Sequence, residues 1–132
     1  MPGRLLICGA VAGELAGLLN CLENGRAETI GRRRTFTGSL NGVRTRLLIT
    51  GPGTPNTVQA LTAAIENRPP RMILMIGCAG AFEGAGLAVG DIGVATGEID
   101  AHLGIEGEAM DAPPTPLPFP VLTAGGMEIP GR

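Results

Sequence analysis

Three short apolar runs in this sequence each end abruptly in glycine and other small residues. The runs, with the small residues that follow them, are Leu5–Cys8 before Gly9-Ala10, Leu47–Ile49 before Gly51-Pro52-Gly53, and Met72–Ile76 before Gly77-Cys78-Ala79-Gly80. A short apolar run bounded by glycine is typical of a buried strand in an α/β sheet. In such sheets ligands bind beyond the carboxyl ends of the strands, where small residues let the backbone approach a ligand closely. The pattern therefore predicts a pocket shared by three strand ends.

Two helices and a hairpin are predicted between these runs. Residues 11–22 carry apolar side chains at helical spacing. Residues 32–50 are predicted to form a β-hairpin, because Asn41-Gly42 is a strong signal for a two-residue turn. Residues 57–67 again have helical spacing, and a last strand is expected over residues 92–95. This order predicts a layered α/β domain with a mixed sheet.

The end of the chain differs in composition from the rest. Residues 107–132 hold six prolines, with no convincing helix or long strand. We therefore expect residues 1–106 to form the α/β domain and residues 107–132 to be a Pro/Gly-rich loop or tail.

Composition argues against several classes of function. Aromatic residues are 2% of the chain and its net charge is −2, so neither a base-stacking platform nor a basic field for nucleic acid is present. Three cysteines without a CxxC motif and one histidine, His102, support neither a zinc site nor a disulfide framework. The first apolar run is too short for a signal peptide or a membrane span. We expect a cytoplasmic protein with no metal, no cofactor, and no nucleic-acid or membrane partner.

Several side chains near the strand ends can carry chemistry, each with a plainer alternative. Glu14 can orient or deprotonate a water, or it can be a helix N-terminal acid stabilised by the helix dipole. Cys78 can be a nucleophile, but with no histidine placed to activate it a small buried thiol is the better interpretation. The amides of the Gly51-Pro52-Gly53 turn can face an anion or a sugar hydroxyl, or form an ordinary strand-to-helix turn. Arg32–Arg34 fits a solvated hairpin edge, with an anion contact as the alternative.

Taken together, these segments resemble the N-terminal part of the nucleoside phosphorylase/nucleosidase superfamily. The resemblance is carried, in order, by Ile7–Ala10 with Glu14, by Thr50–Gly53, by Ile76–Gly80 and by Leu87–Ile92. Their separations are similar to those of the methylthioadenosine/S-adenosylhomocysteine nucleosidases. Residues 80–91 and Glu98–Glu106 resemble the futalosine hydrolases most of all. The fold implied is a three-layer, phosphorylase/hydrolase-like α/β domain with a mixed central sheet, incomplete at its C-terminus.

The resemblance implies hydrolysis of the N-glycosidic bond of a purine nucleoside. For futalosine hydrolases the reaction releases hypoxanthine from futalosine in menaquinone biosynthesis. Glu14 matches the glutamate that positions and activates the attacking water. The residues implied to line the base and ribose are Ala10, Pro52, Cys78, Ala79 and Gly80. Homo-oligomers, commonly dimers, are also implied.

Two features of the sequence bear on this activity. No arginine lies between Gly9 and Gly25 or in the Gly51 turn, which favours water over phosphate as the nucleophile. The family's C-terminal half holds a Met-Glu segment that grips the ribose and an aspartate that protonates the leaving purine. Met127-Glu128 echoes the first, but Pro130 argues against the expected strand, and no Asp follows Asp111.

We therefore expect a truncated chain whose own activity is weak or absent. One alternative is a non-catalytic purine-nucleoside-binding or interaction domain, whose open sheet edge another subunit would cover. The other alternative is a nucleoside phosphorylase.

Overall fold

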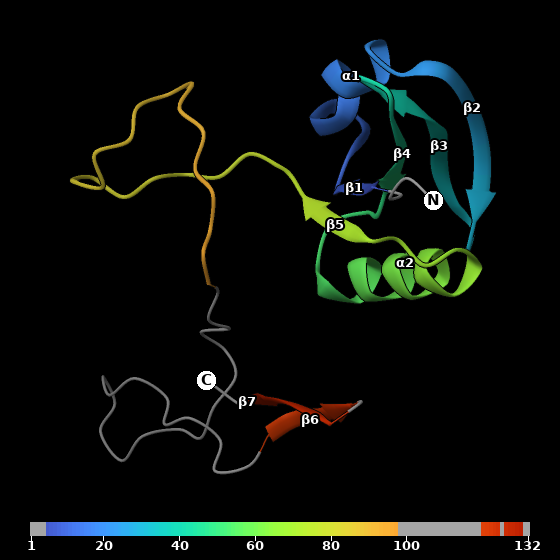
Figure 1. Cartoon of the computed structure of the whole chain (residues 1–132). Helices are drawn as coiled ribbons and strands as arrows, with labels where there is room; N and C mark the ends of the chain where they lie inside the picture. The colour runs from blue at the N-terminus through green and yellow to red at the C-terminus, as the bar shows by residue number, and fades with distance from the viewer. Residues whose placement is uncertain (1–4, 98–119, 125, 131–132) are drawn as a thin grey trace. The chain divides into compact units, whose positions relative to one another are not determined.

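The computed structural model of the chain describes residues 5–97, 120–124 and 126–130. The elements, in order, are β1 Leu5–Gly9, α1 Ala12–Asn20, β2 Glu23–Ile30, β3 Arg33–Leu40, β4 Val43–Ile49, α2 Thr54–Asn67, β5 Met72–Met75, β6 Pro120–Ala124 and β7 Met127–Pro130. The chain divides into two units, Met1–Glu83 and Gly84–Arg132. The first holds β1 to β5 with both helices, and the second holds β6 and β7 (Figure 1).

The first unit is built on a mixed five-stranded sheet with the strand order β2-β3-β4-β1-β5. β1 pairs in parallel with both β4 and β5, whereas β2, β3 and β4 form an antiparallel meander. Because β1, β4 and β5 point the same way, their carboxyl ends at Gly9, Ile49 and Met75 meet at one edge of the sheet. This is the edge at which the sequence predicts a pocket.

The two helices cover opposite faces of this sheet (Figure 1). Successive side chains of a strand point to opposite faces, so β1 and β4 each contribute to two cores. One core holds Leu6, Cys8 and Leu48 with Ala60 and Ala64 of α2, and the other holds Ile7 and Leu47 with Leu15 of α1. The predicted three-layer α/β fold with a mixed central sheet is confirmed.

The hairpin predicted at Asn41-Gly42 is confirmed. Both residues have positive φ, 48° and 76°, as a two-residue turn of type I′ requires. A second hairpin, joining β2 to β3 through Gly31-Arg32, is not among the predicted elements. The sequence of β2 lacks the alternation of apolar and polar residues that would predict a strand, since most of its side chains are polar and exposed. It forms because β3 supplies a pairing partner.

The turn between β2 and β3 packs directly on α2. A Cβ placed on Gly31 would lie 2.4 Å from the Cβ of Ala63, and the φ of Gly31 is +57°. Glycine is therefore required there both by the backbone conformation and by the close approach of the helix. This contact brings the turn before β3 against α2, and Arg33 at the start of β3 then reaches Asn56 and Gln59 in the first half of the helix.

Two expectations for the later part of the chain are wrong. Residues 92–95 form no strand, and Ile92 and Val94 are 89% and 84% exposed. The argument from Pro130 against a strand at Met127 also fails, because β7 pairs antiparallel with β6. In that register Pro130 lies opposite Pro120 at the end of the ribbon, where a missing N–H is tolerated. Glu98–Glu106, with His102, lies outside the described residues.

β5 forms an open edge of the sheet. All four of its side chains, Met72–Met75, are between 40% and 59% exposed. Within the described residues β5 pairs only with β1. The strand carries neither a charge nor a proline, the usual devices that keep an edge from pairing with another chain.

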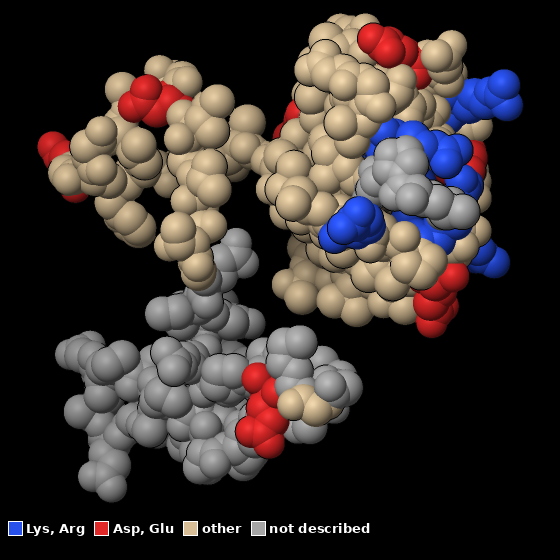
Figure 2. All heavy atoms as spheres, in the orientation of Figure 1, with Lys and Arg blue, Asp and Glu red and all other residues tan. Residues whose placement is uncertain are grey.

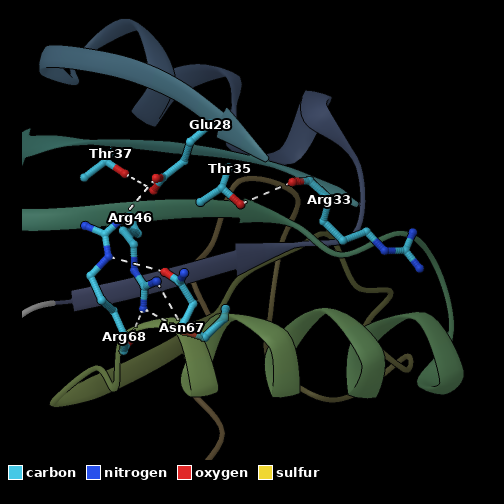
Figure 3. A network of polar contacts seen from close by, with 8 residues as sticks. Glu28, Arg33, Thr35, Thr37, Arg46, Asn67 and Arg68 are labelled. Carbon is cyan, nitrogen blue, oxygen red and sulfur yellow. Dashed lines mark hydrogen bonds and ion pairs between the residues drawn. The ribbon is translucent and has the colours of Figure 1, made fainter. Parts of the chain in front are cut away.

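A buried arginine of the inner strand β4, Arg46, joins the sheet to the C-terminal end of α2 (Figure 3). Both terminal nitrogens of Arg46 donate hydrogen bonds of 3.2 Å to the carbonyl of Ala64, and Nη2 also donates to the carbonyl of Arg68. The last carbonyls of a helix lack intrahelical donors and carry partial negative charge. Arg46 and the C-terminal end of α2 therefore satisfy each other, which fastens β4 to the helix.

A second set of contacts joins β2 to the same helix end (Figure 3). Arg68 forms an ion pair of 3.0 Å with Glu28, and the Thr37 hydroxyl donates to Glu28 as well. A shallow pocket here is lined by Thr37, Arg44, Thr45, Arg46 and Arg68. All ten basic residues of the chain are arginines, and Figure 2 shows several of them together on one face of the first unit. The cluster is a structural one, because helix carbonyls and Glu28 compensate its inner charges.

We expect Arg46→Ala to lower the free energy of unfolding by about 1–3 kcal/mol, because the hydrogen bonds from its charged guanidinium to the carbonyls of Ala64 and Arg68 are lost. Arg44→Ala is the matched control, because Arg44 is exposed on the same strand, and its effect should stay within about 0.5 kcal/mol. Urea denaturation followed by circular dichroism measures both. Equal losses in the two variants would contradict the role given to Arg46.

Candidate active site

Glu14 lies in the first turn of α1, directly after the end of β1. Its Oε2 accepts hydrogen bonds from the backbone N–H of Ala10 at 2.7 Å and of Val11 at 3.1 Å. The bond from Val11 is one half of a capping box, and the other half is missing because a valine side chain has no acceptor. One carboxylate oxygen is thereby anchored above the end of β1.

The other oxygen, Oε1, lies against the chain that leaves β5. A Cβ placed on Gly77 would lie 3.1 Å from Oε1, so a side chain at position 77 would crowd the carboxylate. Within the part of the chain that the structure describes, no hydrogen bond reaches Oε1. Oε1 is therefore the oxygen that can accept a hydrogen bond from a water or a hydroxyl.

Backbone hydrogen bonds continue past the strands and tie the three carboxyl ends together. The carbonyls at the end of β1 accept from both neighbouring segments: Cys8 from Ile76 N at 2.9 Å, Gly9 from Thr50 N at 3.0 Å, and Ala10 from Gly51 N at 3.0 Å. Ala10 thus holds Glu14 through its N–H and the Gly51 turn through its carbonyl. The predicted meeting of Ala10, Glu14 and the Gly51 turn at one sheet edge is what the structure shows.

The Gly51-Pro52-Gly53 turn leads from β4 into α2. Pro52 is exposed, and its carbonyl accepts a hydrogen bond of 2.7 Å from Nδ2 of Asn56. Gly51 and Gly53 have φ of 86° and 85°, and Gly53 caps the helix without a side-chain contribution. The turn is therefore shaped by its glycines and held by backbone contacts and Asn56.

Arg33 is the residue that sequence reasoning missed at this site. The sequence predicts that Arg32–Arg34 lie on a solvated hairpin edge, with an anion contact as the alternative, and it has no arginine within the Gly51 turn itself. In the structure Arg33 is half-buried, and its Nη1 would lie 3.2 Å from a Cβ on Gly51. The signal was available: Thr35 pairs with Leu48 in the hairpin, and continuing that register brings Arg33 level with the residues just before Gly51.

Cys78, Ala79 and Gly80 follow β5 and are all exposed. The interpretation of Cys78 as a buried thiol is therefore wrong. A Cβ placed on Gly80 would meet no atom within 4 Å, so the described residues put nothing beside it. The residue after β5 that approaches Glu14 is Gly77. Contacts of residues 78–80 with a base or a ribose stay a prediction.

Cys8 is the buried thiol of the chain. Burial raises the pKa of the Cys8 thiol from 9.0 to about 11, and the nearby charge of Arg46 opposes part of that shift. Cys21 and Cys78 are free and exposed.

Neither helix in the described residues has the length and apolar character that crossing a membrane requires. Those residues also hold no group of three or more side chains that could bind a metal ion.

We expect two of the three cysteines to react quickly with a thiol reagent at pH 8, and Cys8 to react only after unfolding. The Cys8→Ala variant should lose the slow class and keep both fast thiols. The folded state holds the Cys8 proton more tightly than the unfolded state does, so stability should fall as the pH rises from 9 towards about 11. Three thiols reacting at one rate would contradict the burial of Cys8.

Comparison with known proteins identifies relatives of this chain. Residues 4–125 match the family model of the Phosphorylase superfamily. The 5′-methylthioadenosine/S-adenosylhomocysteine nucleosidase of Bacillus subtilis is 34% identical over 93 residues, which are 70% of this chain and 40% of that protein. The nucleosidase of the same name from Chromohalobacter salexigens is 32% identical over 99 residues, 75% of this chain and 41% of that protein. The chain thus spans about two fifths of the length of these relatives.

Solved structures with a similar fold include nucleosidases of the same name. The nucleosidase of the same name from Neisseria meningitidis, in complex with methylthio-immucillin-A, has a TM-score of 0.62 at 31% identity, covering 67% of this chain and 38% of that one. The nucleosidase from Colwellia psychrerythraea, in complex with adenine, has a TM-score of 0.64 at 25% identity, covering 69% and 37%. A futalosine hydrolase mutant of Helicobacter pylori, at 14% identity and a TM-score of 0.51, covers 55% and 33% and shares the fold.

Proposed function

The chain belongs to the phosphorylase superfamily, and from that premise we propose that it is a purine nucleosidase with Glu14 at its reaction centre. One observation carries the proposal: two backbone amides anchor Oε2 of Glu14, while Oε1 points to the chain leaving β5 and receives no hydrogen bond from the described residues. A carboxylate fixed in this way can orient a water at the strand ends where small residues leave the backbone accessible.

The chemistry follows from that geometry. As the bond between the anomeric carbon and the purine nitrogen stretches, the sugar gains oxocarbenium character. A water held by Oε1 attacks the anomeric carbon, and Glu14 takes the proton that this water loses. The bonding electron pair leaves with the purine, which must then gain a proton.

We infer that the substrate is an adenine nucleoside with a sulfur-bearing 5′ substituent. The support is that the relatives between 31% and 34% identical are named 5′-methylthioadenosine/S-adenosylhomocysteine nucleosidases. Futalosine is the second substrate to test, because residues 80–91 and Glu98–Glu106 resemble the futalosine hydrolases. Hydrolysis of futalosine would assign the chain to menaquinone biosynthesis.

A nucleoside phosphorylase is the second candidate, because Arg33 lies against the Gly51 turn. An arginine near the sugar could bind phosphate. Two of the guanidinium nitrogens, however, already donate to the side chains of Asn56 and Gln59. We therefore keep water as the nucleophile.

Free-base release separates these functions. Methylthioadenosine, S-adenosylhomocysteine, futalosine and inosine are incubated with the chain, with and without phosphate, and the products are separated by chromatography. We expect adenine from methylthioadenosine without phosphate. Release that requires phosphate and yields a sugar phosphate would favour the phosphorylase. Tight nucleoside binding without release would favour the non-catalytic binding domain. A chain that shows no binding and no release would contradict the proposal.

We expect Glu14→Gln to lower the rate of base release by about 10²–10⁴-fold while nucleoside binding is retained. A glutamine oxygen can still accept from Ala10 and Val11, so the anchor survives and the base is lost. Glu66→Gln is the control, since Glu66 is exposed on α2, and it should leave the rate unchanged. Single-turnover assays at saturating nucleoside measure both variants. An active Glu14→Gln enzyme would exclude Glu14 as the base.

We further propose that the chain forms a homo-oligomer that covers the open edge of β5. The support is the exposed, uncharged strand Met72–Met75. Ile73→Lys should reduce the sedimentation coefficient of the wild-type assembly to that of a monomer. Val58→Lys, on the exposed side of α2, should leave it unchanged. A wild-type chain that sediments as a monomer would contradict this proposal.

The cytosol is the compartment we propose for this activity. Cys21 and Cys78 are free and exposed, and Cys8 is a buried free thiol. Free thiols persist in a reducing compartment.

A further inference from the structure

We propose that Arg33 is a positioning residue that acts through Asn56 to set the Gly51-Pro52-Gly53 turn. The resemblance to the nucleosidases implies that Pro52 of this turn lines the ribose, so Arg33 would tune affinity for the ribose part of the ligand and leave affinity for the base unchanged. This rests on the proposed function, because only a nucleoside ligand would place a ribose against Pro52.

Two hydrogen bonds make a relay from the sheet to the turn. Nη2 of Arg33 donates to Oδ1 of Asn56 at 2.7 Å, and Nδ2 of Asn56 donates to the carbonyl of Pro52 at 2.7 Å. The amide of Asn56 is thereby fixed at both ends. Because a charged donor polarises the amide it binds, the bond to Pro52 is strengthened by the one before it.

The same guanidinium is braced from a second side. Nε of Arg33 donates to Oε1 of Gln59 at 2.8 Å, and Nε2 of Gln59 donates to the carbonyl of Gly31 at 2.9 Å. Asn56 and Gln59 are three residues apart in α2, so they lie on one face of the helix. Arg33 therefore donates to two neighbouring side chains on that face, and these two hydrogen bonds fix the orientation of its guanidinium.

Hydrogen bonds hold both ends of the turn, at Gly51 and at Gly53, so its middle at Pro52 is the part that depends on such help. Its two glycines have φ of 86° and 85°, and Pro52 has no N–H to donate. The first turn of α2 has no acidic residue, and Gly53 offers no capping side chain. The carbonyl of Pro52 is therefore the group through which a side chain can hold the middle of the turn, and Asn56 holds it.

The next residue supplies a matched control. Arg34 follows Arg33 in β3, so its side chain leaves the opposite face of the strand. Its guanidinium lies 5.5 Å from the centroid of the Phe36 ring, on the α1 side of the sheet, where Phe36 packs. In Figure 3 Arg33 lies apart from the cluster around Arg46, so replacing it leaves that cluster intact.

Binding measurements test the proposal. Dissociation constants for 5′-methylthioadenosine and for adenine are measured by calorimetry in the wild type and in Arg33→Ala, Asn56→Ala, the double variant and Arg34→Ala. We expect each single variant to weaken nucleoside binding about three- to tenfold, the value of one hydrogen bond, with adenine binding unchanged. The double variant should match the singles, because both changes break one relay. Arg33→Lys, which can still donate to Asn56, should restore part of the affinity.

A structural role alone predicts a different result. Arg33→Ala would then weaken nucleoside and adenine equally, or neither, and additive effects of the two changes would show that Arg33 and Asn56 act separately. Either result overturns the proposal, as does a loss of the same size in Arg34→Ala.

Failure of the proposed function is recognised separately. If the wild type binds neither ligand, the nucleosidase proposal fails, and the relay is judged by the ¹H–¹⁵N resonances of the Asn56 side-chain amide and of Gly51 and Gly53. We expect these resonances to shift in Arg33→Ala and to stay in place in Arg34→Ala, with the rest of both spectra showing a folded chain. Unchanged resonances in Arg33→Ala would overturn the relay.

Discussion

The parallel pairing of β1 with two neighbours is the interaction on which the rest of the structure depends. β1 lies between β4 and β5, and its carbonyls continue to accept hydrogen bonds after the strand has ended, from Ile76, Thr50 and Gly51. This pairing fixes three chain segments far apart in sequence at one sheet edge. Every described site residue that the sequence predicts lies in one of those segments or in the helix that follows β1, and Arg33 joins them from β3. The site is thus a product of backbone pairing, and its side chains need only be small enough to leave the edge open.

The two ends of the sheet carry opposite charges, which the surrounding groups compensate to different extents. At the end beyond Arg46, helix carbonyls and Glu28 compensate the inner charges, so this region stabilises the packing of α2 and β4. At the carboxyl ends, the charge of Glu14 is compensated at one oxygen by two amides and left without a described protein donor at the other. This asymmetry between the two oxygens of one carboxylate is the observation that supports the proposed role of Glu14 as the base.

Sequence reasoning succeeded where a signal is local and failed where pairing decides. The apolar runs of β1, β4 and β5 and the Asn41-Gly42 turn each carry their own pattern, and all four are in place. β2 has no such pattern and exists because β3 pairs with it, whereas residues 92–95 have the pattern but no described partner strand. At the site, Glu14 and the Gly51 turn follow from strand ends, but Arg33 does not. Its place depends on the hairpin register, which the Asn41-Gly42 turn sets, and on the close contact of Gly31 with Ala63, which no local pattern encodes.

The two interpretations of Glu14, helix cap and reacting carboxylate, are compatible with one geometry. A carboxylate at N3 of a helix bonds back to the N-cap backbone, which stabilises the helix and freezes the side chain. Freezing the side chain through Oε2 aims Oε1 at the chain leaving β5, and the absence of a side chain at Gly77 leaves it room. The cost of ordering a flexible carboxylate is therefore met when the helix folds and does not have to be met again when a nucleoside binds. A cap built from serine or threonine would stabilise α1 equally well but would leave no second oxygen to work with.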